Sequence, residues 1–120
     1  MRKVELLVTP DGKCPVRDFI DTLPIKTQAK TYATFKIVQN MSIVPEKFFK
    51  KMTGSDLYEI RVLHDKMLYR YLSFFHNGNI VIVAHGFEKR SKKTPEREMT
   101  TAIERIKGFK EQFREVSHEK

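Results

Sequence analysis

Three stretches with the composition of β-strands follow one another in the second half of this 120-residue chain. They limit the possible folds more than any other feature of the sequence. The stretches are residues 57–63, 67–75 and 79–87, and all are rich in β-branched and aromatic residues. His64-Asp65-Lys66 connects the first two, and His76-Asn77-Gly78-Asn79 connects the last two. Asn-Gly is the strongest short hairpin signal, so the sequence predicts an antiparallel meander.

A short strand and two helices are expected ahead of the meander. Residues 3–8 suit a strand that ends at the turn signal Thr9-Pro10-Asp11-Gly12. The stretch PVRDFIDTLP has apolar residues at helical spacing and ends at Pro24, which predicts a short helix. A second helix is expected over residues 25–40. Its predicted buried stripe consists of Ala29, Tyr32, Ala33, Ile37 and Met41.

One more helix is expected after the meander, and residues 42–55 are expected to form a connection. Thr94 suits the N-cap of that last helix, and Pro95 suits its first position. Phe48 and Phe49, within KFFKK, either lie under the core or help to present a basic loop to a partner. The predicted apolar face of the last helix consists of Met99, Ala102, Ile103, Ile106, Phe109 and Phe113. This order predicts one α+β domain over residues 1–120, with its helices collected on one side of a small sheet.

The charge of the chain favours anionic partners such as nucleic acid. The formal net charge is +8 and the sequence pI is about 9.7. No apolar run approaches the roughly 20 residues of a membrane span, and the N-terminal stretch lacks a signal-peptide pattern. We therefore expect a cytoplasmic protein that does not bind membranes. Cys14 is the only cysteine, and no spacing typical of metal ligands occurs, so neither a metal nor another cofactor is expected.

Two-residue turns in both hairpins would place three basic side chains in a row on one face of the sheet. A turn at Asp65-Lys66 sets Arg61 opposite Arg70, and a turn at Asn77-Gly78 sets Arg70 opposite His85. Facing arginines repel each other unless an anion lies between them. On this reading, removing Arg70 costs little stability or even adds some. The opposite face of these strands is expected to meet the helices.

The first hairpin also has alternative registers. A turn centred on His64-Asp65 pairs Glu59 with Arg70, which is a plain cross-strand ion pair. A three-residue loop would place Arg61 and Arg70 on opposite faces and would remove the row.

The side chains gathered on this face suffice for one kind of chemistry, the cleavage of RNA by its own 2′-hydroxyl, which needs no cofactor. Glu59 or His85 is the expected base. Arg61 and Arg70 are expected to stabilise the charge that develops on phosphorus. Lys89 or His85 is the expected acid. Further RNA contacts are expected from Phe87, which would stack on a base, and from Arg90, Lys92 and Lys93.

Several motifs connect the chain to a known group of proteins. They are LYEIRV (57–62), YRYLSFF (69–75) and VIVAHGFEKRSKKTPEREM (81–99), followed by the closing helix. With them the chain resembles the HigB-type, phage-related branch of the RelE/ParE toxin superfamily. The resemblance implies a RelE-like fold and a type II toxin that cuts mRNA on the ribosome. It also implies a helix-turn-helix antitoxin, which neutralises the toxin and joins it in binding the operator DNA of the pair.

The matched positions carry the candidate site. Arg61 stands at the arginine of the Leu-x-Glu-Leu-Arg strand, and Arg70 at the Tyr-Arg of the central strand. Phe87, Lys89 and Lys93 match the Phe-x-Lys and Lys-Thr-Pro positions. The chain lacks the tyrosine that some relatives place near the C-terminus. Some branches of the superfamily poison DNA gyrase, and other members are solitary phage proteins of unknown activity. A gyrase inhibitor and a non-catalytic nucleic-acid-binding protein are therefore the alternatives.

Overall fold

The computed structural model describes residues 1–90 and 92–118 of the chain, and only the backbone of residues 114–118. One five-stranded sheet forms its centre, in the order β1-β5-β4-β3-β2. The elements along the chain are β1 (Lys3–Leu6), α1 (Pro15–Asp21), α2 (Ile25–Asn40), β2 (Phe49–Lys51), β3 (Tyr58–His64), β4 (Met67–His76), β5 (Ile80–Glu88) and α3 (Glu96–His118). This confirms the predicted α+β fold, with a leading strand, two helices, a meander and a closing helix.

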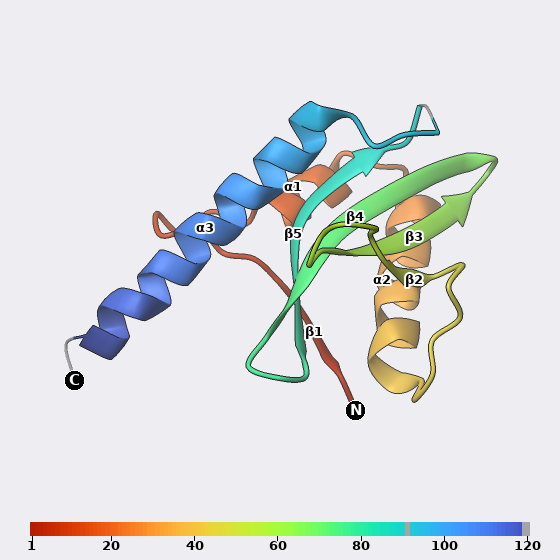
Figure 1. Ribbon diagram of the computed structural model, residues 1–120. Coiled ribbons are helices and arrows are strands. Elements are labelled where there is room, and N and C mark those ends of the chain that lie inside the picture. Colours follow the sequence, from red (N-terminus) through yellow and green to blue (C-terminus); the bar gives the residue numbers. More distant parts are fainter. Residues whose placement is uncertain (91, 119–120) are drawn as a thin grey trace.

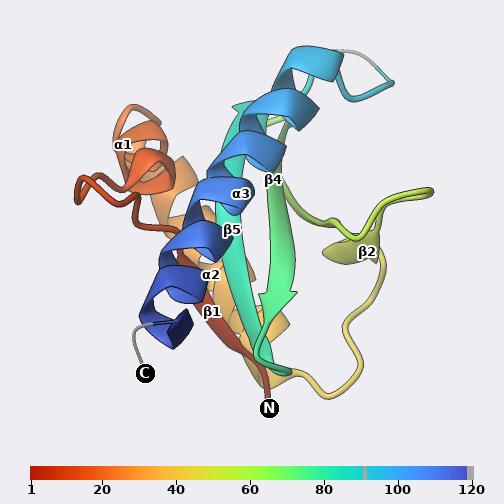
Figure 2. The ribbon, with the colours of Figure 1, turned by 60° about the vertical axis from the view of Figure 1, so that its left-hand side comes forward.

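The helices cover both faces of the sheet, which corrects the expectation that they gather on one side. In Figures 1 and 2, α3 lies across one face, whereas α1 and α2 lie across the other. The reason is that the meander strands are apolar on both faces, so each face needs a cover. Leu72, Phe74 and Ala84 pack against the buried side of α3, while Tyr71 and Val83 pack against α1 and α2.

The face of α2 that meets the sheet is not the one predicted. Ala29, Tyr32, Ala33 and Met41 are exposed and Ile37 is half-buried. The helix instead buries Thr27, Thr31, Thr34, Phe35 and Val38. A threonine methyl group can pack in a core when its hydroxyl is hydrogen-bonded, and here the hydroxyls bond to carbonyls of the preceding turn. Thr31 Oγ1 donates to Thr27 O, and Thr34 Oγ1 donates to Lys30 O, each at 2.8 Å. Apolar periodicity alone therefore indicated the wrong face.

The two outer strands complete the sheet. β1 pairs in parallel with β5, with Lys3 opposite Ile80, whereas the other pairings are antiparallel. β2 lies within the stretch that was expected to be only a connection, and it pairs Lys50 with Glu59. Phe49 in β2 packs into the core, stacked on Tyr58 with ring centroids 5.0 Å apart. Its partnership with aromatic residues of the sheet explains why so short a stretch becomes a strand.

The register of the first hairpin is confirmed, because its two-residue turn places Arg61 opposite Arg70. Asp65 and Lys66 both adopt positive φ angles, of 50° and 66°, as the primed hairpin turns require. The alternatives with a shifted or three-residue turn are therefore excluded.

The register of the second hairpin is not the predicted one. Three residues, 77–79, form the turn, and a bulge at Ala84 shifts the pairing once more. Arg70 consequently faces Phe87, and His85 faces Leu72. The two shifts add up to two residues, and side chains alternate with a period of two. His85 thus stays on the same face as Arg70 but moves away from the position opposite it.

The last helix begins at Glu96, slightly later than expected. The carbonyl of Pro95 accepts the first helical hydrogen bonds, from the amides of Glu98 and Met99. Ala102, Ile106 and Phe109 are buried on the sheet, as their spacing predicted. Ile103 and Phe113 were expected on the same face, but they are about half exposed, at 53% and 46%. The stripe that meets the sheet is narrower than the one in the sequence because α3 alone covers this side.

Gly86 offers a test of the packing on the α1–α2 side. A Cβ atom there would lie 2.6 Å from a ring carbon of Tyr71 and 3.0 Å from one of Phe19. We expect Gly86→Ala to lower the free energy of unfolding by about 2 kcal/mol through overpacking. Urea denaturation measures it. Gly108→Ala is the control, because a Cβ on this helical glycine meets nothing within 4 Å. It should raise stability by up to about 1 kcal/mol, and equal losses in both variants would contradict the packing.

Candidate nucleic-acid interface

The candidate site is built around Glu59, whose carboxylate lies between two arginines. Arg61 Nε is 2.5 Å from Glu59 Oε1, and Arg70 Nη1 is 3.2 Å from Glu59 Oε2. Residues two apart on β3 point to the same face, and the hairpin register brings Arg70 beside them. The Glu59 carboxylate thus supplies the anion that the two facing arginines require. The cross-strand pair of Glu59 with Arg70 forms together with the Arg61–Arg70 register, although the two were expected to exclude each other.

Arg70 is the buried member of this cluster. Its side chain is 7% exposed, against 32% for Arg61. Burial lowers the pKa of Arg70, while Glu59 acts in the opposite direction. Arg70 Nη1 also donates a 3.0 Å hydrogen bond to Thr94 Oγ1. Thr94 therefore ties the loop before α3 to the sheet and does not serve as the expected N-cap. Arg70 positions the cluster, and Arg61 presents its charge to solvent.

β2 adds a cation that the sequence did not assign to the site. Lys50 is exposed and lies opposite Glu59 in the β2–β3 ladder. A hollow of about 160 Å³ opens here, lined by Lys50, Lys51, Met52, Thr53, Glu59 and Arg61. The KFFKK stretch had been noted as a basic loop, and its pairing with β3 makes it the wall of this hollow. Only the pairing, which depends on Phe49 entering the core, reveals this role.

Lys89 joins the cluster from the end of β5. Its amide donates to Leu68 O at 2.7 Å, which places the residue beside β4. Partial burial lowers the pKa of the Lys89 amine, and the positive charge of Arg70 lowers it further, against the influence of Glu59. A lysine with a lowered pKa gives up its proton more easily, so Lys89 has the character of a proton donor.

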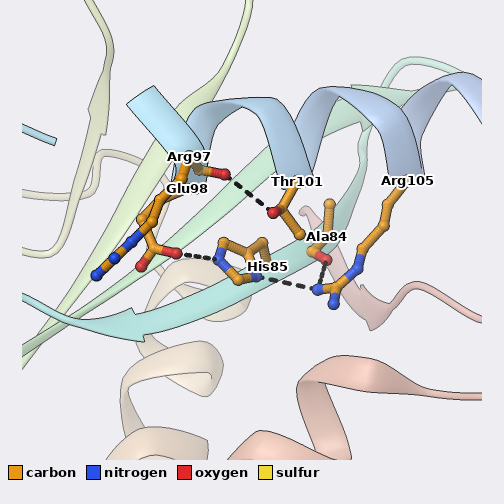
Figure 3. Close-up of polar contacts among 6 residues, drawn as sticks. All are labelled: Ala84, His85, Arg97, Glu98, Thr101 and Arg105. Atoms are coloured by element: carbon orange, nitrogen blue, oxygen red, sulfur yellow. Dashed lines mark hydrogen bonds and ion pairs between the residues drawn. The ribbon is translucent and has the colours of Figure 1, made fainter. Parts of the chain in front are cut away.

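His85 belongs to a separate cluster beneath α3, shown in Figure 3. Its Nε2 lies 3.2 Å from Glu98 Oε1, and its Nδ1 lies 3.0 Å from Arg105 Nη1. An arginine can only donate, so Nδ1 accepts that bond and Nε2 carries the proton. Arg105 Nη1 also donates to Ala84 O at 3.1 Å. With burial lowering the pKa of His85, this neutral ring clamps α3 to β5 and has both nitrogens occupied.

The remaining predicted RNA contacts divide into one buried residue and three on the loop after β5. Phe87 is 6% exposed and stacks on His85, with ring centroids 5.7 Å apart. It belongs to the core under α3, which corrects the expectation that its ring is open to a base. Lys92 and Lys93 are exposed. Arg90 is also exposed, and its Nη2 lies 3.8 Å from Glu88 Oε1.

Residues 1–90 and 92–113, whose side chains the structure describes, hold no cluster of three or more His, Cys, Asp or Glu side chains that could bind a metal. No helix within these residues combines the length and the apolar character needed to cross a membrane.

The described residues combine an α+β fold with a basic cluster on one face of the sheet. A comparison with protein families adds that residues 18–107, most of the chain, match the family described as "Phage derived protein Gp49-like". The chain therefore belongs to this phage-derived, toxin-like family. A search of curated proteins finds no significant match.

The buried ion pair predicts that Arg70 supports stability, which reverses the expectation of relieved repulsion. Arg70→Met should lower the free energy of unfolding by about 3 kcal/mol, because it leaves Glu59 buried beside a single partner. Arg61→Met should lower it by less than about 1 kcal/mol, since that arginine is partly solvated. Urea denaturation gives both values. The double variant Glu59→Leu/Arg70→Met should recover most of the loss, and an Arg70→Met protein as stable as the wild type would contradict this account.

The His85 cluster predicts a pH dependence of stability. The pKa of His85 is lowered in the folded protein, so the unfolded chain binds the proton more readily. Stability should therefore decrease as the pH falls below about 6.5, the ordinary value for histidine. Urea midpoints between neutral and mildly acidic pH measure this decrease. It should shrink in His85→Gln and remain in His64→Gln, and an unchanged decrease in His85→Gln would contradict the assignment.

Proposed function

We propose that this protein is the toxin of a type II toxin–antitoxin pair and acts as a metal-independent endoribonuclease on ribosome-bound mRNA. The observation that carries the proposal is the Glu59-centred cluster. It holds Arg61 partly open to solvent, with Lys50 opposite Glu59 and with Lys89 near enough to feel the charges of the cluster, so that several cations gather where a phosphate would bind. Membership of a phage-derived, toxin-like family supports the same reading.

The proposed reaction uses the 2′-hydroxyl of the RNA as nucleophile. A base removes its proton, the oxygen attacks the adjacent phosphorus, and the bond to the 5′-oxygen breaks. The departing 5′-oxygen takes up a proton from the acid, so the products are a 2′,3′-cyclic phosphate and a free 5′-hydroxyl. Guanidinium and ammonium groups stabilise the additional negative charge that the phosphorus centre carries in the transition state.

The geometry suggests how the residues divide these tasks. Arg61 contacts the phosphate, and Arg70 holds Glu59 and thereby Arg61 in position. Lys89, with its lowered pKa, is the proposed acid. Glu59 remains a candidate base, although both of its oxygens already bind arginines. His85 would act mainly by holding α3 against the sheet, since both ring nitrogens are occupied.

The proposed partners are the ribosome with its mRNA and a helix-turn-helix antitoxin, as in HigB-type pairs. The antitoxin would cover the basic face, and operator DNA would be bound only by the complex of the two proteins. Lys92 and Lys93 on the loop before α3, together with Arg90, would contact RNA through its phosphates.

A cleavage assay tests this function. Purified protein is added to mRNA-programmed bacterial ribosomes, and the 5′ ends of the fragments are mapped. We expect cuts within the A-site codon. The cleavage rate should be lower by about a hundredfold or more in Arg61→Ala and in Lys89→Met. Lys36→Ala, on the far side of α2, should cut like the wild type.

A different result would separate this function from its alternatives. Intact mRNA with a wild-type protein that still arrests growth would overturn the endoribonuclease and direct attention to DNA gyrase. Supercoiling assays with the same variants then decide, because a gyrase inhibitor has no need for Arg61 as a phosphate ligand.

A further inference from the structure

We infer that the edge of β3 beyond the end of β2 forms a second RNA subsite, which binds a nucleotide next to the one at the Glu59-centred cluster. This inference rests on the proposed function and extends it. A hollow of about 270 Å³ lies at this edge, lined by Lys30, Thr34, Lys47, Phe48, Arg61 and Leu63. We call this the edge hollow, and the described residues that line it include three cations and no carboxylate.

The edge hollow exists because β2 is short. β2 pairs only with Tyr58–Ile60, so β3 continues past β2 beyond Ile60. The amide of Arg61 still donates to Phe48 O at 2.8 Å, which fixes the backbone at this point. Figure 1 shows the chain leaving the end of α2 and turning back to β2. The residues that line the edge hollow come from α2, from this connection and from β3.

Arg61 links the two hollows. It lines the space next to Lys50 and Glu59 as well as the edge hollow next to Lys30. In a single strand of RNA, each phosphate joins two neighbouring nucleotides. A strand whose phosphate meets Arg61 would therefore reach the edge hollow with its neighbouring nucleotide.

Phe48 gives the edge hollow a surface for a base. The two neighbouring phenylalanines divide between core and edge, with Phe49 packed on Tyr58 and Phe48 half-buried in the lining of the edge hollow. Lys47 Nζ lies 5.0 Å from the centroid of the Phe48 ring. An aromatic ring beside lysines is the usual platform for an unstacked base of single-stranded nucleic acid. The flanking cations Lys30 and Lys47 are both exposed and suit phosphate contacts.

Binding measurements across a range of salt concentrations test this subsite. The probe is a short, fluorescein-labelled, 2′-O-methylated single-stranded RNA, which cannot be cut. Lys30→Ala/Lys47→Ala should lower the slope of log affinity against log salt by about 1.4, or about 0.7 for each lost phosphate contact. Phe48→Ala should weaken binding about tenfold at an unchanged slope. Phe48→Leu keeps an apolar side chain there and should weaken binding similarly, which separates lost stacking from lost folding.

The matched control is Lys36→Ala, which removes an exposed lysine from the opposite side of the same helix. Lys36 lines the separate groove formed by β1 with Tyr32 and Phe35. Its removal should leave the binding of the probe as in the wild type. A Lys30→Ala/Lys47→Ala slope equal to that of the control would overturn the subsite.

Cleavage on programmed ribosomes provides a second readout. The Lys30→Ala/Lys47→Ala and Phe48→Ala variants should raise the KM about tenfold and leave kcat nearly unchanged, because they bind away from the reacting phosphate. If these variants cut mRNA as efficiently as the wild type and with the same KM, the result would overturn the subsite alone. A wild-type protein that neither binds the probe nor cuts mRNA would overturn the proposed function and the subsite together.

Discussion

The arrangement of the basic surface depends on one buried interaction, the carboxylate of Glu59 between Arg61 and Arg70. Two arginines on facing strand positions would destabilise the hairpin, and a lone buried carboxylate would destabilise the protein considerably more. Together the three side chains satisfy one another within the sheet. The excess positive charge of the cluster falls on Arg61, the member that reaches solvent. A device that stabilises the hairpin thus also presents a cation at the surface.

The second organising element is α3, which closes the face that carries this cluster. His85 binds Glu98 and Arg105 of the helix, and Arg70 binds Thr94 just before it. These contacts place the loop after β5 beside the arginines and leave Lys89 half-buried among their charges. The aromatic residue expected to receive a base is consequently core, and a half-buried ring, that of Phe48, lies in the edge hollow beside Arg61.

Sequence reasoning located the elements better than their contacts. The preferred register of the first hairpin is confirmed, because the structure has a two-residue turn with positive φ at both positions and so excludes the alternatives. The predicted register of the second hairpin was wrong, because a longer turn and a bulge at Ala84 shift the pairing and leave little trace in local composition. The buried face of α2 was missed because threonines satisfy their hydroxyls within the helix and then pack like apolar residues. The sequence offered nine candidate residues without their division between surface and core, and Lys50, which lies opposite Glu59, was not among them.

What the sequence by itself determined is the net positive charge and the order of the strands and helices other than β2, and it favoured the pairing of Arg61 with Arg70 among three registers. These follow from local signals: period, turn chemistry and composition. Tertiary structure decided that helices cover both faces, that β2 brings Lys50 opposite Glu59 and that His85 turns to α3. These outcomes depend on which apolar faces bury one another across the whole chain. Burial energy sums over distant residues, so no short stretch of sequence contains the answer.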